Sequence, residues 1–470
     1  MSELHYQSAK NLARMIREKE LSVTEVMQVH LDRINQTNPQ VNAICTLLPE
    51  DELLAQAAAK DADLASGVTP GPLFGLPIAV KDLALTKDIR TTMGSLIYKD
   101  FVPEIDALFV ERMKAAGAII IGKTNTPEFG AGSNSFNKVF GMTRNPYDLN
   151  KVAGGSSGGG AAALAAGMIP LADGSDLGGS VRNPPSFNNV FGLRPSPGRI
   201  PRVPNLQPWG SMPVLGPMAR SVEDAGLLLS VMAGYDGRDP LALKGDPNIY
   251  TQSLAADMKG KKIAWTPDLG RLPVDPEVIL VLEQNLAIFE EMGCIVERAH
   301  PELMGGEDVF QTMRAASFAA GLLEDLKNHA DKMKRTVIWN IEKGLPMTGL
   351  EIAAAQQKRG EHFQEMVAFM NEYDYLLLPT AQVPPFSVDI EYPLEINGEK
   401  MHTYIDWMMI VSLITNTEHP AASVPGGFTA DGLPVGLQIV GKYRDELSVL
   451  HLAYAFEQAT GFGNKRPELG

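Results

Sequence analysis

The chain has 470 residues, with 41 Lys and Arg against 56 Asp and Glu, and a formal net charge of −15 at pH 7. A nucleic-acid-binding protein normally carries a basic patch, so this acidic balance disfavours a nucleic-acid partner. No apolar run reaches the roughly 18 residues of a membrane-spanning helix, and the first residues hold no apolar signal segment. We therefore expect a cytoplasmic protein without a membrane partner.

Cysteine and histidine are sparse and scattered. The two cysteines, Cys45 and Cys294, lie far apart in the sequence. This excludes a disulfide framework and a cysteine-based zinc site, and it fits a reducing compartment. No two of the eight histidines have the three- or four-residue spacing of a helical metal site. The sequence therefore predicts no metal site.

The first third of the chain changes from helices to alternating elements. Residues 8–35 repeat apolar residues at helical spacing and predict two helices, with Ser22 or Thr24 as the N-cap of the second. Residues 50–66 predict a third helix. A buried strand is expected over residues 75–82, a helix over 107–117 and a strand over 118–125. This strand–helix–strand order favours parallel α/β layering.

The remaining elements continue the α/β pattern without an internal repeat. We expect strands over residues 168–174, 261–266, 373–381 and 434–441. We expect helices over residues 161–167, 278–292 and 445–458, and several helices between 304 and 370. The chain is therefore predicted to be one domain with a variable middle.

A glycine-rich loop, "VAGGSSGGGAAALAAG", occupies residues 152–167. A phosphate-binding loop would need a lysine before its Ser or Thr, and a dinucleotide-binding loop would follow an apolar strand. This loop has neither feature, and its alanine run is too helix-prone for a flexible linker. We therefore expect a tight loop that opens a buried helix.

A second glycine–serine turn, "DGSDLGGSVR", occupies residues 173–182 and places Ser180 after two glycines. A serine surrounded by free backbone N–H groups suits acyl transfer, in which the hydroxyl attacks and the amides bind the oxyanion. The alternative is a helix N-cap serine. Lys81, at the end of a buried strand, is a candidate base, because burial lowers a lysine pKa. The alternative is an ordinary surface lysine.

Several blocks occur in an order that resembles the amidase signature hydrolases. They are "GLPIAVKD", "TTMGS", "GKTNTPEFG", "TRNPYD", "GGSSGGG", "DGSDLGGSVRNPPSF", "HPAASVPGGF" and "GLPVGLQIVG". The resemblance is weakest between residues 243 and 371. It implies an α/β amidase signature fold, with a mixed central β-sheet covered by helices on both faces. It also implies a single amidase domain over residues 1–470, divided into N-terminal helices (1–66), signature core (67–235), variable substrate-pocket region (236–400) and C-terminal return to the core (401–470).

The resemblance also implies a catalytic triad of two serines and a lysine. The nucleophile falls on Ser180, the base on Lys81, and the bridging serine on Ser156, which would follow a cis Gly155–Ser156 peptide. The oxyanion hole would consist of the backbone amides of Leu177, Gly178, Gly179 and Ser180. Supporting roles fall on Ser157, Asp176 and Arg182. The implied reaction needs no metal or organic cofactor.

The implied substrate is a small-molecule carboxylic amide, with a homodimer as a possible assembly. Its pocket would include Glu128, Phe129 and Gly130, and also Trp339, Trp407 or Met408 from the later part of the chain.

Two alternatives stay open: the A subunit of a tRNA-dependent glutaminyl amidotransferase, and a non-catalytic binding protein on the same fold. The family often has Thr at the position of Leu177 and Ser or Ala at Gly160, and this chain also departs at Pro184–Pro185, Asn188–Asn189 and Arg194–Ser196. These departures and the acidic charge favour a bacterial small-molecule amidase.

Overall fold

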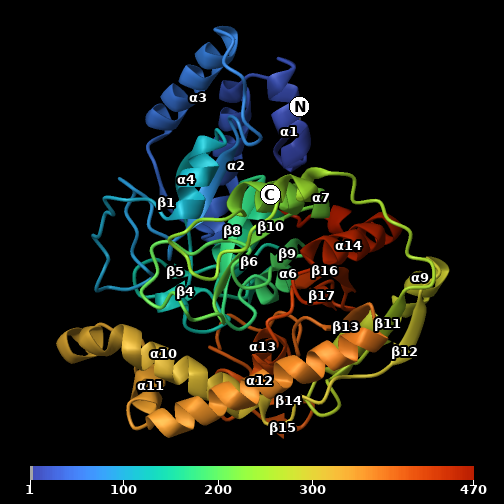
Figure 1. Ribbon diagram of the computed structural model, residues 1–470. Coiled ribbons are helices and arrows are strands. Elements are labelled where there is room, and N and C mark those ends of the chain that lie inside the picture. Colours follow the sequence, from blue (N-terminus) through green and yellow to red (C-terminus); the bar gives the residue numbers. More distant parts are fainter. Residues whose placement is uncertain (1–3, 470) are drawn as a thin grey trace.

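The computed structural model describes residues 4–469 and begins with three helices that project from the body of the molecule (Figure 1). They are α1 (Ala9–Arg17), α2 (Val23–Val41) and α3 (Glu50–Ala65). Ser22 is the N-cap of α2: its hydroxyl accepts the Glu25 N–H, and the Glu25 carboxylate accepts the Ser22 N–H. Thr24 instead donates its hydroxyl to Asp61. The predicted cap is therefore confirmed at Ser22.

A three-stranded sheet follows the N-terminal helices. Its strands are β1 (Ile44–Leu47), β2 (Pro77–Lys81) and β3 (Ile119–Thr124), in the order β1-β3-β2. Strands β2 and β3 are parallel and are connected through α4 (Leu108–Ala115), as the strand–helix–strand pattern predicted. Every residue of β2 is buried, and Lys81 is its last residue. The sheet therefore places a lysine at the end of an apolar strand inside the molecule.

The main sheet has eight strands in the order β12-β11-β13-β17-β16-β9-β10-β8. Their bounds are β8 (Leu171–Asp176), β9 (Phe191–Arg194), β10 (Val214–Ala219), β11 (Lys262–Trp265), β12 (Ile295–Arg298), β13 (Tyr375–Pro379), β16 (Ala421–Phe428) and β17 (Pro434–Val440). Only β11 pairs in parallel, with β12 and β13; the other pairs are antiparallel. The sheet is thus mixed, and parallel layering is confined to one edge and to the small sheet.

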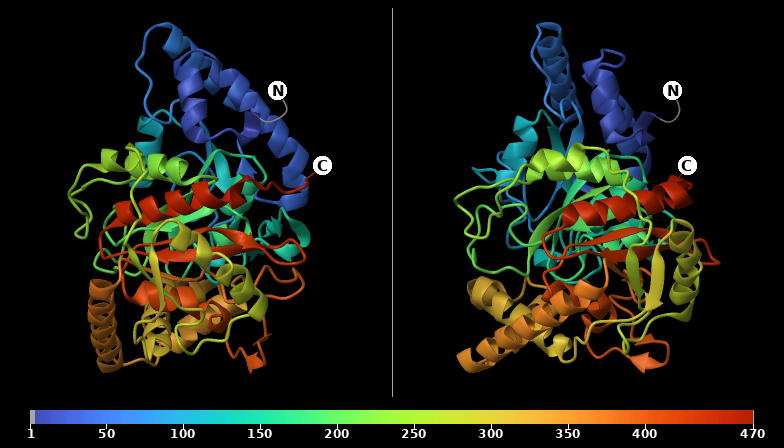
Figure 2. Two further views of the ribbon diagram at one scale, coloured as in Figure 1. Left: turned by 90° about the vertical axis from the view of Figure 1, so that its right-hand side faces the viewer. Right: turned by 45° about the vertical axis from the view of Figure 1, so that its right-hand side comes forward.

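Helices cover both faces of the main sheet (Figures 1 and 2). On one side lie α7 (Val222–Met232) and α14 (Glu446–Thr460), and on the other α10 (Gly306–His329), α12 (Gly349–Glu372) and α13 (Met409–Asn416). The other helices are α5 (Gly158–Ala165), α6 (Asn183–Phe187), α8 (Pro276–Glu283), α9 (Leu286–Glu291) and α11 (Arg335–Gly344). This arrangement confirms the mixed α/β fold that the sequence predicted.

Short elements complete the chain. Three two-stranded ribbons pair β4 (Phe136–Asn137) with β5 (Gly141–Met142), β6 (Arg144–Asn145) with β7 (Asp148–Val152), and β14 (Glu395–Ile396) with β15 (Glu399–Lys400). Single 3-10 turns are η1 (Leu4–Tyr6), η2 (Glu128–Gly130), η3 (Pro247–Thr251), η4 (Asp406–Met408) and η5 (Phe462–Asn464).

The expectation of one continuous helix over residues 278–292 is wrong. The segment divides into α8 and α9. Asn285, between the two helices, is buried, and its side-chain amide donates to the Gly426 carbonyl at 2.6 Å. A buried amide needs a hydrogen-bond partner. This bond to β16 therefore fixes the non-helical segment between α8 and α9 against the main sheet.

Candidate active site

The glycine–serine loop leads directly into α5 and brings its backbone against neighbouring segments. The Gly155–Ser156 peptide bond is cis, as the family resemblance implied. A Cβ atom on Gly155 would lie 2.6 Å from the Asn134 backbone nitrogen, and one on Gly159 would lie 2.3 Å from the Asn125 backbone nitrogen. No side chain fits at these two positions, so the glycines allow the close approach that seats Ser156 next to β2.

Lys81 is surrounded by serine hydroxyls. Its Nζ lies 2.8 Å from Oγ of Ser156, 2.8 Å from Oγ of Ser157 and 3.0 Å from Oγ of Ser175. Lys81 is 1% exposed. Ser156 was expected beside Lys81, whereas Ser157 was expected only in a supporting role and Ser175 was missed. Its place in the "DGSD" motif, two residues after Asp173 on the adjacent strand, could have indicated it.

The environment of Lys81 favours the neutral amine. Burial lowers the pKa of Lys81 to about 7, although the carboxylates of Asp173 and Asp176 act in the opposite direction. Asp173 accepts the Lys81 backbone N–H at 3.0 Å, and burial raises the pKa of its own carboxyl group. A substantial fraction of Lys81 is therefore unprotonated near pH 7.

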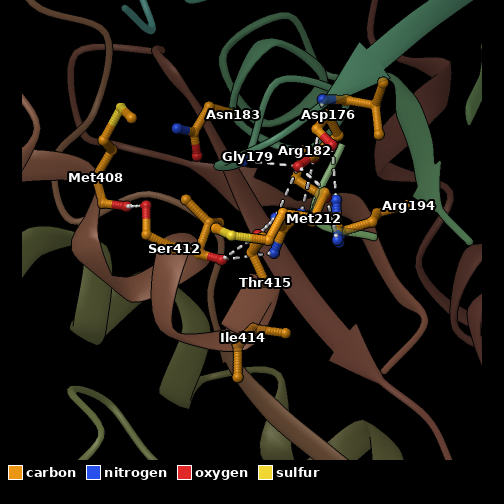
Figure 3. A network of polar contacts seen from close by, with 12 residues as sticks. Asp176, Gly179, Arg182, Asn183, Arg194, Met212, Met408, Ser412, Ile414 and Thr415 are labelled. Atoms are coloured by element: carbon orange, nitrogen blue, oxygen red, sulfur yellow. Dashed lines mark hydrogen bonds and ion pairs between the residues drawn. The ribbon is translucent and has the colours of Figure 1, made fainter. Parts of the chain in front are cut away.

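The turn that carries Ser180 is built around Asp176. Its carboxylate accepts the backbone N–H groups of Gly179 at 2.9 Å and Val181 at 3.1 Å. It also forms ion pairs with Arg182 at 3.0 Å and Arg194 at 3.2 Å, and all three side chains are fully buried (Figure 3). Burial alone would raise the pKa of Asp176, but the two guanidinium groups hold it well below its ordinary value.

Arg182 connects this turn to the main sheet and to α13. It donates to Gln438 on β17 at 2.7 Å, and to the Val411 carbonyl and the Thr415 hydroxyl on α13. Asp176 and Arg182 thus fix the path of residues 176–182, which is consistent with their expected supporting roles. The turn does not place Ser180 at a helix N-terminus, because α6 begins only at Asn183 and has five residues.

The backbone amides of the turn divide into two groups. The Gly179 N–H points to Asp176, so this amide is engaged within the turn, in contrast to the expected four-amide oxyanion hole. Within residues 4–469, no protein acceptor bonds the N–H groups of Leu177, Gly178 or Ser180. These three amides are the ones available to a ligand.

A cavity of about 160 Å³ joins the two serine-bearing segments. Its walls include Ser156, Ser180, Leu177, Gly178, Phe129 and Gly130. A Cβ atom on Gly130 would lie 3.5 Å from Ser156 Oγ, so the small residue leaves room beside that hydroxyl. The cavity therefore brings together residues that are far apart in the sequence.

The other expected pocket residues differ in their positions. Met408 lies in the cavity wall. Glu128 does not: its carboxylate accepts from the Ser95 hydroxyl at 2.6 Å and from the Lys334 backbone, and burial raises its pKa. Trp407 is packed against Phe187, outside the wall.

Trp339 also lies outside the wall, where it packs edge-on against Tyr404. Two wall residues that the sequence did not indicate are Arg314 and Phe318 on α10.

The described part of the chain contains neither a metal-binding cluster nor a membrane-spanning helix. Within residues 4–469, no three His, Cys, Asp or Glu side chains gather as a metal-binding group would require. In the same range, no helix combines the length and apolar character needed to cross a bilayer.

Residues 25–450 match the Amidase family. The chain is 35% identical over 469 residues to an acylamidase of Rhodococcus erythropolis, covering 99% of this chain and 98% of that protein. It is 36% identical over 494 residues to the A subunit of the glutamyl-tRNA(Gln) amidotransferase of Geobacillus thermodenitrificans, covering 100% and 99%. A bacterial aryl acylamidase of the amidase signature family superposes with a TM-score of 0.92 at 32% identity, over 98% of both chains.

These findings define the class of the protein. The chain belongs to the Amidase family and has the amidase signature fold. It is a hydrolase of carbon–nitrogen amide bonds.

Proposed function

We propose that the protein hydrolyses a small-molecule carboxylic amide to a carboxylate and ammonia or an amine, through an acyl-enzyme on Ser180. The observation that carries this proposal is the contact between a buried Lys81 and Ser156 at 2.8 Å, beside the cavity that Ser156 shares with Ser180. A nucleophilic serine needs a base within hydrogen-bond reach, directly or through one intermediate group.

The proton route follows from the hydroxyls around Lys81. A neutral amine has two N–H donors and one lone pair. Donation to Ser157 and Ser175 leaves the lone pair for the Ser156 O–H. Ser156 in turn accepts the proton of Ser180 as the Ser180 oxygen attacks the amide carbonyl. The tetrahedral intermediate then collapses, and the proton passes back through Ser156 to the departing nitrogen.

The charge on the substrate oxygen requires backbone donors. The amides of Leu177, Gly178 and Ser180 supply them in this proposal, while Asp176 holds the Gly179 amide and the turn in place. Fixed amides stabilise an oxyanion strongly, because they need no reorganisation during the reaction. Water then attacks the acyl-enzyme by the same route, and the carboxylate is released.

A second candidate is the A chain of a glutaminyl amidotransferase, because identity to such proteins is as high as identity to the acylamidase. That function requires partner chains and an acylated tRNA. Leu177 and the other departures from the family pattern support the hydrolase instead. A test of glutamine-dependent transamidation of glutamyl-tRNA, with and without added partner chains from a relative, distinguishes the two.

The proposed function is tested with purified protein and a panel of primary amides, anilides and N-acyl amines. We expect release of amine or ammonia in equal amount to carboxylate, with at least a thousandfold loss in Ser180→Ala. No turnover of any amide, or full turnover in Ser180→Ala, would contradict the proposal.

A further inference from the structure

Arg314 on α10 lies in the wall of the cavity that contains Ser156 and Ser180. It is 4% exposed. Its Nη2 donates to the Tyr404 hydroxyl at 2.8 Å, and its Nε is buried without an acceptor. An arginine side chain stays charged in proteins and has five N–H donors. One neutral hydroxyl therefore leaves most of the hydrogen-bonding capacity of this cation unused.

The other buried arginines are paired differently. Arg182, Arg194 and Arg359 contact carboxylates, and Arg33 and Arg220 donate to backbone carbonyls. Within residues 4–469, Arg314 alone among the buried arginines has neither a carboxylate nor a carbonyl acceptor. Because a buried charge without a partner is costly, such a group indicates a ligand that supplies the opposite charge.

The surroundings hold the guanidinium group in place without neutralising it. Its Cζ lies 4.5 Å from the centre of the Phe318 ring, and the Tyr404 hydroxyl that it contacts also accepts a hydrogen bond from Asn340. The nearby cation Lys334 is paired with Glu391 at 2.7 Å. Arg314 is thus an oriented cation that forms no ion pair with any acidic side chain among residues 4–469.

We infer that Arg314 binds a carboxylate of the substrate, so that the preferred substrates are small amides with a negatively charged group close to the scissile bond. The inference rests on the proposed amide hydrolysis and names its substrate class. A planar guanidinium group matches a carboxylate in bidentate geometry. The cavity volume of about 160 Å³ is close to the roughly 150 Å³ of a protein cavity that holds one benzene molecule, which suits a short acid amide.

Two pairs of compounds test the inference, because the carboxylate can belong to either side of the amide. Succinamate carries it on the acyl side and is compared with 4-methylpentanamide, in which an isopropyl group replaces the carboxylate. N-acetylglycine carries it on the amine side and is compared with N-isobutylacetamide. We expect the charged member of one pair to have the higher kcat/KM, and that pair identifies the side.

The variant Arg314→Met removes the charge while keeping an unbranched side chain. We expect the ratio of kcat/KM for the charged compound to kcat/KM for its neutral partner to be about 10- to 100-fold lower in the variant than in wild type. This is the range typical of a charged hydrogen bond. Arg314→Lys should retain part of the ratio. The matched control is Arg335→Met on α11, whose side chain is 80% exposed, and its ratio should equal that of the wild type. An unchanged ratio in Arg314→Met for both pairs would overturn the inference.

Binding separates this inference from the proposed function. Calorimetric titration of succinamate and N-acetylglycine into Ser180→Ala should show binding of one of them that is lost in Ser180→Ala/Arg314→Met. If wild type binds succinamate or N-acetylglycine but hydrolyses no amide, the proposed function is contradicted, whereas the anion site at Arg314 is still supported. Hydrolysis with no dependence on Arg314 would contradict the anion site alone. If Arg314→Met does not fold, Tyr404→Phe removes the hydroxyl that orients the guanidinium and should lower the same ratio.

Discussion

Lys81 is the residue whose charge state most directly controls the proposed reaction. Its ordinary pKa of 10.5 would leave roughly one molecule in 3,000 neutral at pH 7. Burial lowers this pKa to about 7, so about half of the molecules carry a neutral base. At 1.36 kcal/mol per tenfold change in the neutral fraction, the protein environment removes about 5 kcal/mol from the cost of preparing the base.

The pH dependence of kcat/KM follows from the neutral base. Because only neutral Lys81 can accept a proton, we expect kcat/KM to rise with pH through a single limb near pH 7 and then level off. Lys81→Met should remove the limb. It should also lower kcat/KM for an amide by about 10²- to 10⁴-fold, the usual contribution of a general base. An activated ester with the same acyl group should lose less, since its leaving group needs no proton.

The assay is a set of initial rates between pH 5 and 10 for wild type and variant on a matched amide and ester. Lys123→Met is the matched control, because Lys123 is also buried and burial lowers its pKa to about 8, but it contacts Ala84 and Thr86 instead of the serines. The control should keep the limb near pH 7. A limb that persists in Lys81→Met, or equal losses on amide and ester, would refute the assignment of Lys81 as the base.

Three further outcomes are expected. Asp176→Asn leaves the buried guanidinium groups of Arg182 and Arg194 without their carboxylate. Urea unfolding should therefore show that the free energy of unfolding falls by about 3–5 kcal/mol. A fall below about 1 kcal/mol would contradict the stabilising role of the ion pairs. Burial raises the pKa of Glu457 from 4.5 to about 7, so the native state binds this proton more tightly and stability falls as pH rises through that window. The Tm of Glu457→Gln relative to wild type should therefore rise as the pH increases from 5 to 8. A Tm difference that does not change with pH would contradict the raised pKa of Glu457. EDTA should leave kcat/KM unchanged, because the proposed proton route uses no Lewis acid; loss of activity that a divalent ion restores would disprove that route.

The parts of the fold that depend on local sequence could be predicted. The apolar strand that ends at Lys81, the capped helix after Ser22 and the parallel β2–α4–β3 unit each have a periodic or capping signal within a few residues. The order of the eight-stranded sheet has no such signal, because strands such as β9 and β16 pair across more than 200 residues. The break at Asn285 depends on a bond to Gly426, which no local pattern reveals.

The candidate site divides in the same way. Ser156, Ser157 and Lys81 were expected as site residues from the family resemblance, and Lys81 Nζ lies 2.8 Å from the hydroxyl oxygen of each serine. Arg314 could not be expected, because the sequence pattern is weakest where α10 lies and the side chain reaches the cavity only through tertiary packing. Glu128, which was expected in the pocket, does not line the cavity, and its carboxylate accepts from Ser95 and the Lys334 backbone.

The central claim is that Ser180 becomes acylated during turnover. Treatment of the protein with a fluorophosphonate reagent, followed by peptide mapping with mass spectrometry, identifies the reactive serine. The account predicts one modified residue, Ser180, with labelling that slows strongly in Lys81→Met and is absent in Ser180→Ala. Modification of Ser156, Ser157 or Ser175 in place of Ser180, or undiminished labelling in Ser180→Ala, would contradict it.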